Sequence, residues 1–309
     1  MTERYDLIVL GGGAAGLTAA LYGARAHLKT LIIDTGTPGG QMNLTYKVAN
    51  YPGVLEASGA DIVMTMRRQA ESFGARLLSH AEVAEVALTG AEKSVVVEDE
   101  GTFVAPAIIL APGAMPRTLG LGSEARFQGR GISYCATCDG DFFTDQDIAV
   151  IGGGNSALEE AVSLTKFASS VTIIHEFDHF QAQPWAVEQA KKNPKIRFLM
   201  EQTVKDFEGE ESLTAVISEH KRTGEVTRTP VSGVFLFIGY VPNTGWLREK
   251  IDINERGEIL TDESMKTSVA GVFAAGDARQ KRYRQVTTAV SDGAIAAIAA
   301  SEYVASLAA

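Results

Sequence analysis

The stretch VLGGGAAGLTAALYGAR, residues 9–25, decides the fold class, because a glycine run joins an apolar segment to a helical pattern. The preceding YDLIVL is typical of a buried strand, and the residues after the glycines repeat at helical spacing. Such a turn needs one glycine for the bend, a second for close approach of a pyrophosphate, and a small third residue for helix–strand packing. Gly11, Gly13 and Gly16 occupy these positions. We therefore predict a nucleotide-binding turn, with the phosphates at the helix N-terminus.

The same pattern occurs a second time in VIGGGNSALEEAVSL, residues 150–164, where Gly152, Gly154 and Ala157 take the three positions. Each copy is followed by a second strand that ends in an acid, Asp34 in TLIIDT and Glu176 in VTIIHE. An acid at this distance accepts hydrogen bonds from ribose hydroxyls. The chain is therefore expected to hold two nucleotide-binding units.

Short β-branched runs alternate with helical patterns along all 309 residues, which predicts the α/β class with parallel sheets covered on both faces. The net charge of −10 argues against nucleic acid as a partner, since phosphate binding needs a basic surface. No apolar stretch is long enough for a membrane span, and the start lacks a secretory pattern. With only two cysteines, a reducing cytoplasm is the expected location.

Both cysteines lie in ISYCATCDGDFF, residues 132–143, as Cys135-x-x-Cys138. A structural disulfide would close a very short loop and stabilise the fold little. A zinc site with His175 and His179 would need an interval far longer than that of a zinc finger. A redox dithiol is favoured over both, and a metal site is not expected.

Several motifs together resemble the low-molecular-weight, bacterial-type thioredoxin reductases. In order, they are the first glycine turn, GGQ, ANYPG, the dithiol, GGGNSA, FIGYVPNT and GVFAAGDA. The resemblance covers essentially the whole chain. It implies two Rossmann-like three-layer nucleotide-binding domains, with the second inserted into the first. Residues 1–115 and 244–309 would form a discontinuous FAD-binding domain, and residues 116–243 a pyridine-nucleotide-type domain that carries the dithiol.

The resemblance also assigns binding positions. For FAD they are Gly11, Gly13, Ala14, Ala15, Gly16, Asp34, Gly40, Gln41, Asn50, Gly113, Gly276, Asp277, Arg284, Gln285 and Val286. For the pyridine nucleotide they are Gly152, Gly154, Asn155, Ser156, Ala157, His175 and Glu176. Pro112 departs from the threonine that is usual in the family.

The implied activity is reduction of a thioredoxin-type protein disulfide by a homodimeric flavoenzyme. Cys138 would be the thiol nearer the flavin, Cys135 would attack the partner disulfide, and Asp139 would act as acid and base. Alternatively, Asp139 is a helix or turn cap. The basic loop ARQKRYRQ, residues 278–285, is interpreted as a solvated loop, with an acidic-partner docking patch as the alternative.

The electron donor is left open by the segment HEFDHFQA, residues 175–182. NADPH-dependent members carry an HRRxxxR pattern there, whose arginines bind the 2′-phosphate. Here Glu176, Phe177 and Gln181 replace the arginines, so the resemblance and the charge at 176 favour NADH and disfavour NADPH. Ferredoxin or another carrier is an alternative donor.

Two further readings remain from the sequence. The chain could be an NADH oxidase or a flavoprotein of a peroxide-reducing system, in which the same dithiol serves another partner. It could also be a flavin-bearing redox sensor that does not turn over. An assay of partner reduction distinguishes these two hypotheses from the thioredoxin reductase hypothesis.

Overall fold

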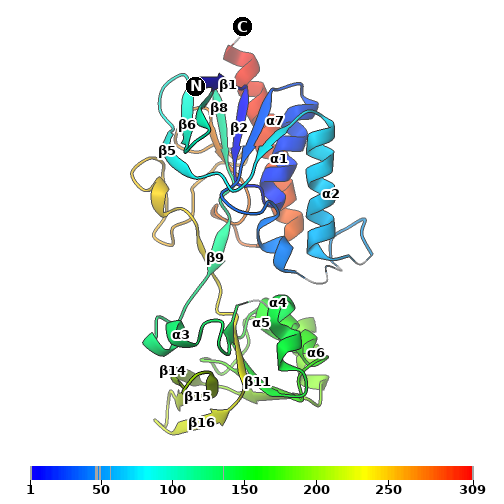
Figure 1. The fold of residues 1–309 in the computed structure, drawn as a ribbon, viewed down its shortest axis with the longest axis vertical. Coiled ribbons are helices and arrows are strands. Elements are labelled where there is room, and N and C mark those ends of the chain that lie inside the picture. The colour runs from blue at the N-terminus through cyan, green and yellow to red at the C-terminus, as the bar shows by residue number, and fades with distance from the viewer. Residues whose placement is uncertain (1, 46–47, 49, 56, 135, 308–309) are drawn as a thin grey trace. The chain divides into compact units, whose positions relative to one another are not determined.

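We describe the protein from a computed structural model of residues 2–45, 48, 50–55, 57–134 and 136–307, with backbone alone at 44, 137, 138 and 240. The chain divides into two compact units (Figure 1). The first comprises Met1–Met115 and Val241–Ala309, and the second comprises Pro116–Tyr240. The chain returns to the first unit at Val241. The sequence analysis expected this return at position 244.

A five-stranded parallel sheet forms the centre of the first unit. Its order is β19 (Val272–Ala274), β8 (Ala107–Leu110), β2 (Leu7–Leu10), β3 (Thr30–Ile33) and β4 (Arg76–Leu78). Strands β19, β8, β2 and β3 are buried along their whole length, which explains their unbroken apolar sequences. Because β2 is the middle strand, the glycine run that follows it lies at the centre of the sheet's carboxyl edge.

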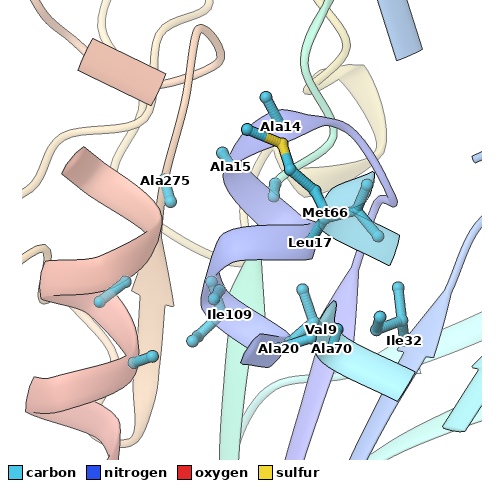
Figure 2. Packing of buried hydrophobic residues seen from close by; sticks show 14 of the residues in the cluster. Val9, Ala14, Ala15, Leu17, Ala20, Ile32, Met66, Ala70, Ile109 and Ala275 are labelled. Atoms are coloured by element: carbon cyan, nitrogen blue, oxygen red, sulfur yellow. The ribbon is translucent and has the colours of Figure 1, made fainter. Parts of the chain in front are cut away.

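Three layers make up this unit. Helices α1 (Ala14–Arg25), α2 (Gly59–Ser72) and α7 (Val286–Leu307) lie on one side of the sheet (Figure 1). Figure 2 shows Val9, Ile32 and Ile109 of the strands packed with Leu17 and Ala20 of α1. The alternate strand residues face a second sheet, whose order is β1 (Thr2–Arg4), β7 (Gly101–Ala105), β6 (Lys93–Val97) and β5 (Val83–Ala87).

The second unit repeats this layering. Its parallel sheet has the order β10 (Ile132–Ser133), β17 (Gly233–Leu236), β11 (Asp147–Ile151), β12 (Ser170–Ile174) and β13 (Ile196–Leu199). One face packs against α5 (Asn155–Leu164) and α6 (Pro184–Lys192). The other face packs against the antiparallel sheet of β14 (Gln202–Gly209), β15 (Leu213–His220) and β16 (Val226–Pro230).

The predicted α/β class, with two parallel sheets of the nucleotide-binding type, is confirmed. The second sheet of each unit, mixed in the first unit and antiparallel in the second, was not predicted, because its strands are mixed polar and apolar. Short elements complete the chain: α3 (Gly122–Phe127), α4 (Ala136–Asp139), and the 3-10 turns η1 (Gly40–Leu44), η2 (Gly140–Phe143) and η3 (Gly245–Leu247).

The two segments that connect the units pair with each other as strands β9 (Ala114–Pro116) and β18 (Tyr240–Pro242). The Asn243 amide donates to the Gly113 carbonyl at 2.9 Å, and the Arg117 amide donates to the Gly239 carbonyl at 2.8 Å. Both connecting segments are therefore extended and hydrogen-bonded to each other.

Candidate functional site

The first glycine turn has the geometry that phosphate binding requires. Gly11 has a φ of +106°, and a Cβ there would lie 2.1 Å from the Ala111 carbonyl oxygen. A Cβ at Gly16 would lie 1.8 Å from the Gly11 oxygen, so both positions exclude any side chain. Gly13, in contrast, faces open space and begins α1 without a side-chain cap. The free amides of this helix end are therefore available to an anion.

Asp34 is held beside this turn by two backbone amides. Its Oδ2 accepts from the Gly12 amide and its Oδ1 accepts from the Gly36 amide at 2.7 Å. Each carboxylate oxygen keeps a second lone pair for a ligand hydroxyl. Asp34 therefore lies beside the glycine turn, and its contact with a ribose stays a prediction.

Two other predicted FAD residues, Gly40 and Gly276, lie against the same turn. Gly40 has a φ of +56° and approaches the Cα of Gly13, and a Cβ on Gly276 would lie 2.9 Å from that of Ala15. Ala14 is buried, and Asn50 donates to the Gln285 side-chain oxygen at 3.1 Å from a segment far away in the sequence. Three more lie in or beside regular elements: Gln41 in η1, Gly113 directly before β9 and Val286 at the start of α7.

The loop that follows β19 contains a buried acceptor, the Oδ1 atom of Asp277. Among the described residues its neighbour is the Lys281 ammonium, an ion-pair partner at the long distance of 3.4 Å. Burial raises the pKa of this carboxyl, and the Lys281 charge opposes the rise. A carboxylate oxygen with a single long contact can still accept a hydrogen bond from a ligand hydroxyl. The described residues therefore fit a flavin nucleotide with a polyhydroxyl chain.

Asp292 organises this loop, and the sequence analysis missed it. This buried carboxylate on α7 accepts from the Gly276 amide at 3.1 Å and the Lys281 ammonium at 2.8 Å, and it lies 3.0 Å from Arg279 Nε. Its only sequence signal was an aspartate inside an alanine-rich helix. Because Gly276 and Asp277 are adjacent, Asp292 fixes the backbone that presents Asp277.

The basic loop of residues 278–285 is therefore not simply a solvated loop. Arg279 and Lys281 are mostly buried in ion pairs with Asp292, and Arg284 pairs with the buried carboxylate of Glu258. Arg282 is exposed over the Tyr283 ring. Most of the charge that suggested an acidic docking partner instead holds the loop together.

The second glycine turn has the same geometry as the first, and its middle glycine also lies against the His175 ring. Gly152 has a φ of +137°, and a Cβ there would lie 2.2 Å from the Phe237 carbonyl oxygen. Gly154 begins α5 in open space, Ser156 is exposed and Ala157 is fully buried. A Cβ at the middle glycine, Gly153, would lie 2.3–2.5 Å from the His175 ring.

The segment after β12 is fastened to this turn. The Gln181 amide donates to the Gly153 carbonyl at 2.9 Å, and the Gln183 amide donates to the Asn155 side-chain oxygen at 2.6 Å. His175 Nε2 donates to the His179 carbonyl at 3.1 Å, and its ring stacks on Phe180. Burial lowers the pKa of His175, so the ring is a neutral packing surface at neutral pH.

The dithiol is only partly described. Cys135 lies outside the described residues, and Cys138 lies in α4 with its backbone alone described. Asp139 ends α4, is half-buried, and makes no capping hydrogen bond to η2. This geometry does not support the cap interpretation of Asp139.

A buried hydrogen bond anchors the residue that precedes Cys135. The Tyr134 hydroxyl donates to Glu124 Oε1 at 2.6 Å, and the Gly120 amide donates to Glu124 Oε2 at 2.9 Å. Burial and the bond to Glu124 raise the pKa of Tyr134. Glu124 is only 2% exposed, so the chain enters the dithiol segment from a fixed point. Neither residue stood out in the sequence.

Two acids on α5 have perturbed titration. Burial raises the pKa of Glu159, and burial with repulsion from Glu159 raises the pKa of Glu160 to about 7.

Within the described residues, no group of three or more His, Cys, Asp or Glu side chains could hold a metal. No described helix is long and apolar enough to cross a membrane.

The comparisons with known proteins agree with this geometry. Residues 5–293 match the family model for pyridine nucleotide-disulphide oxidoreductases. The chain is 44% identical over 311 residues to the thioredoxin reductase of Peptoclostridium acidaminophilum, covering 98% of each protein. It is 43% identical to that of Treponema pallidum, again covering 98% of each. The crystal structure of Lactococcus lactis thioredoxin reductase superposes with a TM-score of 0.94 and 41% identity, covering 98% of this chain and 99% of that one.

Replacing Asp292 with asparagine should weaken FAD binding about tenfold or more, because Lys281 and Arg279 would keep buried charges without their anion. Fluorescence titration of the flavin-free protein with FAD measures this directly. Lys281→Met, which removes a buried cation instead, should weaken FAD binding as well. Arg282→Met removes an exposed cation of the same loop and should leave the affinity unchanged. Equal affinities in all four proteins would contradict the role given to Asp292.

Replacing Glu160 with glutamine should stabilise the protein at high pH. When a carboxyl has a higher pKa in the folded than in the unfolded state, its ionisation destabilises the folded protein. The protein therefore loses stability as pH rises from about 4.5 to about 7. Glu160→Gln should therefore match the parent Tm at pH 4.5 and exceed it by several degrees at pH 8. Glu211→Gln, at an exposed position, serves as the control. A gain that is the same at both pH values would rule out ionisation of Glu160 as its cause.

Proposed function

We propose that this chain, which belongs to the pyridine nucleotide-disulphide oxidoreductase family and within it to the low-molecular-weight thioredoxin reductases, uses NADH to reduce a thioredoxin-type disulfide. The chain is an FAD-dependent oxidoreductase of the thioredoxin reductase type. The donor, the partner and the residue roles below are our proposal. The observation that carries the proposal is the pair of glycine turns, one in each unit, each open at a helix N-terminus.

The first unit would hold FAD. Gly13 and the start of α1 would receive the pyrophosphate, Asp34 the ribose, and Asp277 a hydroxyl of the ribityl chain. When bound, FAD supplies two-electron exchange between a hydride donor and a disulfide. The buried oxygen of Asp277 supports this assignment, because its one described neighbour, the Lys281 ammonium at 3.4 Å, leaves it able to accept from a ligand hydroxyl.

The dithiol would carry both electrons to the partner. The Cys135 thiolate attacks one sulfur of the partner disulfide, which forms a mixed disulfide and releases the partner's other sulfur as a thiolate. Cys138 then attacks Cys135, which frees the second partner thiolate and leaves a Cys135–Cys138 disulfide. Asp139 would deliver a proton to a departing thiolate and recover one later. Its half-buried side chain without a capping bond is compatible with this role.

Donor choice would depend on the segment after β12. None of the three positions at which NADPH-dependent members carry arginine holds a cation, since they are Glu176, Phe177 and Gln181. A 2′-phosphate would therefore lose several charge-assisted hydrogen bonds, whereas Glu176 can accept from a free 2′-hydroxyl. Glu176 is exposed on the surface, so its repulsion of a phosphate is reduced by solvent.

Ferredoxin or another carrier is the second candidate donor. The observation that favours it is the segment of Gln181 and Gln183, which is hydrogen-bonded onto the second glycine turn. If that segment does not yield to a nucleotide, the turn serves packing alone. A homodimer is also part of the proposal, and exposed apolar side chains on α1, α2 and α7 (Tyr22, Met64 and Ile298) support it.

Anaerobic reduction of the FAD-loaded protein should bleach the flavin with NADH, with a kcat/KM about tenfold or more above that for NADPH. The combined change Glu176→Arg, Phe177→Arg and Gln181→Arg should reverse this preference, because it supplies the missing cations. Stopped-flow absorbance at the flavin band measures both. Faster bleaching by NADPH in the unmodified protein would contradict NADH as donor. Bleaching by reduced ferredoxin alone would transfer the proposal to the second candidate.

A further inference from the structure

The acid expected to contact the ribose has a cation beside it that no motif contains. The Lys221 ammonium lies 3.3 Å from Glu176 Oε2 and 5.1 Å from the centre of the Phe177 ring. Lys221 follows β15 at the tip of the β15–β16 hairpin, 45 residues further along the chain. Both charged side chains are about half exposed, 42% for the lysine and 54% for the glutamate.

Backbone hydrogen bonds set the position of this lysine. The Lys221 amide donates to the Glu201 carbonyl at 2.8 Å, and the Glu201 amide donates to the Phe177 carbonyl at 3.2 Å. The next amide, that of Gln202, donates to the His175 carbonyl at 2.9 Å. The hairpin tip is thus joined through Glu201 to the segment that carries Glu176. Because these are backbone hydrogen bonds, the fold itself holds the Lys221 and Glu176 side chains near each other.

The neighbouring charges are already paired with other groups. Arg222 Nη2 contacts the Glu201 carboxylate, and His179 Nδ1 contacts the Asp178 carboxylate at 2.6 Å. Lys221 is consequently the cation that faces Glu176 among the described residues. With Lys221 present, an incoming 2′-phosphate meets a charge pair, not a lone carboxylate. Glu176 in turn is drawn toward the hairpin and keeps Oε1 available to a hydroxyl.

We propose that Lys221 is a specificity-determining residue for the donor, because its ammonium limits how strongly Glu176 discriminates against a 2′-phosphate. The inference rests on the proposed use of a pyridine nucleotide at this turn. An exposed ion pair contributes roughly 0.2–1 kcal/mol, and a tenfold change corresponds to about 1.4 kcal/mol. Removing Lys221 should therefore change the discrimination about 1.4- to 5-fold. In a Glu176→Gln variant no carboxylate faces Lys221, so the ammonium can contact the phosphate. Removing Lys221 from that variant should change the discrimination at least as much.

Calorimetric titration of the FAD-loaded protein with ADP-ribose and with 2′-phospho-ADP-ribose tests this without turnover. The measured quantity is the dissociation constant of 2′-phospho-ADP-ribose divided by that of ADP-ribose, and the control variant shows how far a general loss of positive charge changes this ratio. The proteins are the parent, Lys221→Met, Glu176→Gln and the double variant. Lys192→Met is the matched control, because Lys192 is also exposed and ion-paired in the second unit.

Lys221→Met should raise the ratio, Glu176→Gln should lower it, and adding Lys221→Met to Glu176→Gln should raise it again. Lys192→Met should leave it unchanged. A ratio that Lys221→Met leaves unchanged or lowers would overturn the inference. If 2′-phospho-ADP-ribose binds the parent more tightly than ADP-ribose, the NADH proposal fails, yet the four-protein comparison still decides the role of Lys221. If neither ligand binds any of the proteins, both ideas are wrong.

Discussion

Both units depend on one close contact, between a glycine in the left-handed region and the carbonyl at the end of a neighbouring strand. Gly11 approaches Ala111 in the first unit, and Gly152 approaches Phe237 in the second, so closely that a β carbon would overlap the oxygen. This contact places each helix start against the carboxyl edge of its sheet. It also leaves the next-but-one glycine, Gly13 or Gly154, open to a ligand. The proposed nucleotide sites therefore follow from packing that must exist before any nucleotide binds.

A second level of organisation comes from buried acids. Asp292 gathers two cations and an amide to fix the loop of Asp277, and Glu124 gathers a phenol and an amide to fix the start of the dithiol segment. Buried carboxylates require such complete sets of partners, because an unpaired charge in the interior is costly. In both units a buried acid outside the glycine turn thus holds a segment that is proposed to take part in the chemistry.

The local part of this architecture could be predicted from the sequence. Continuous apolar strands, glycine turns and the acids Asp34 and Glu176 are patterns within short windows, and the folded chain places Asp34 against its turn. The contacts of Asp292, Glu124 and Lys221 join segments that are distant in sequence, or depend on burial that no window reveals. Reading residues 278–285 as a solvated charge run failed for this reason, since their counter-ions are on α7 and at Glu258. The roles of Cys135 and Cys138 stay predictions.

The central claim is that electrons pass from a bound flavin to the Cys135–Cys138 pair. Anaerobic reductive titration of the FAD-loaded protein, compared with a Cys135→Ser, Cys138→Ser variant, tests it most directly. The unmodified protein should take up twice as many electrons per flavin as the variant, because the dithiol stores a second pair. Equal uptake by the two proteins, with protein-disulfide reduction retained in the variant, would contradict the claim.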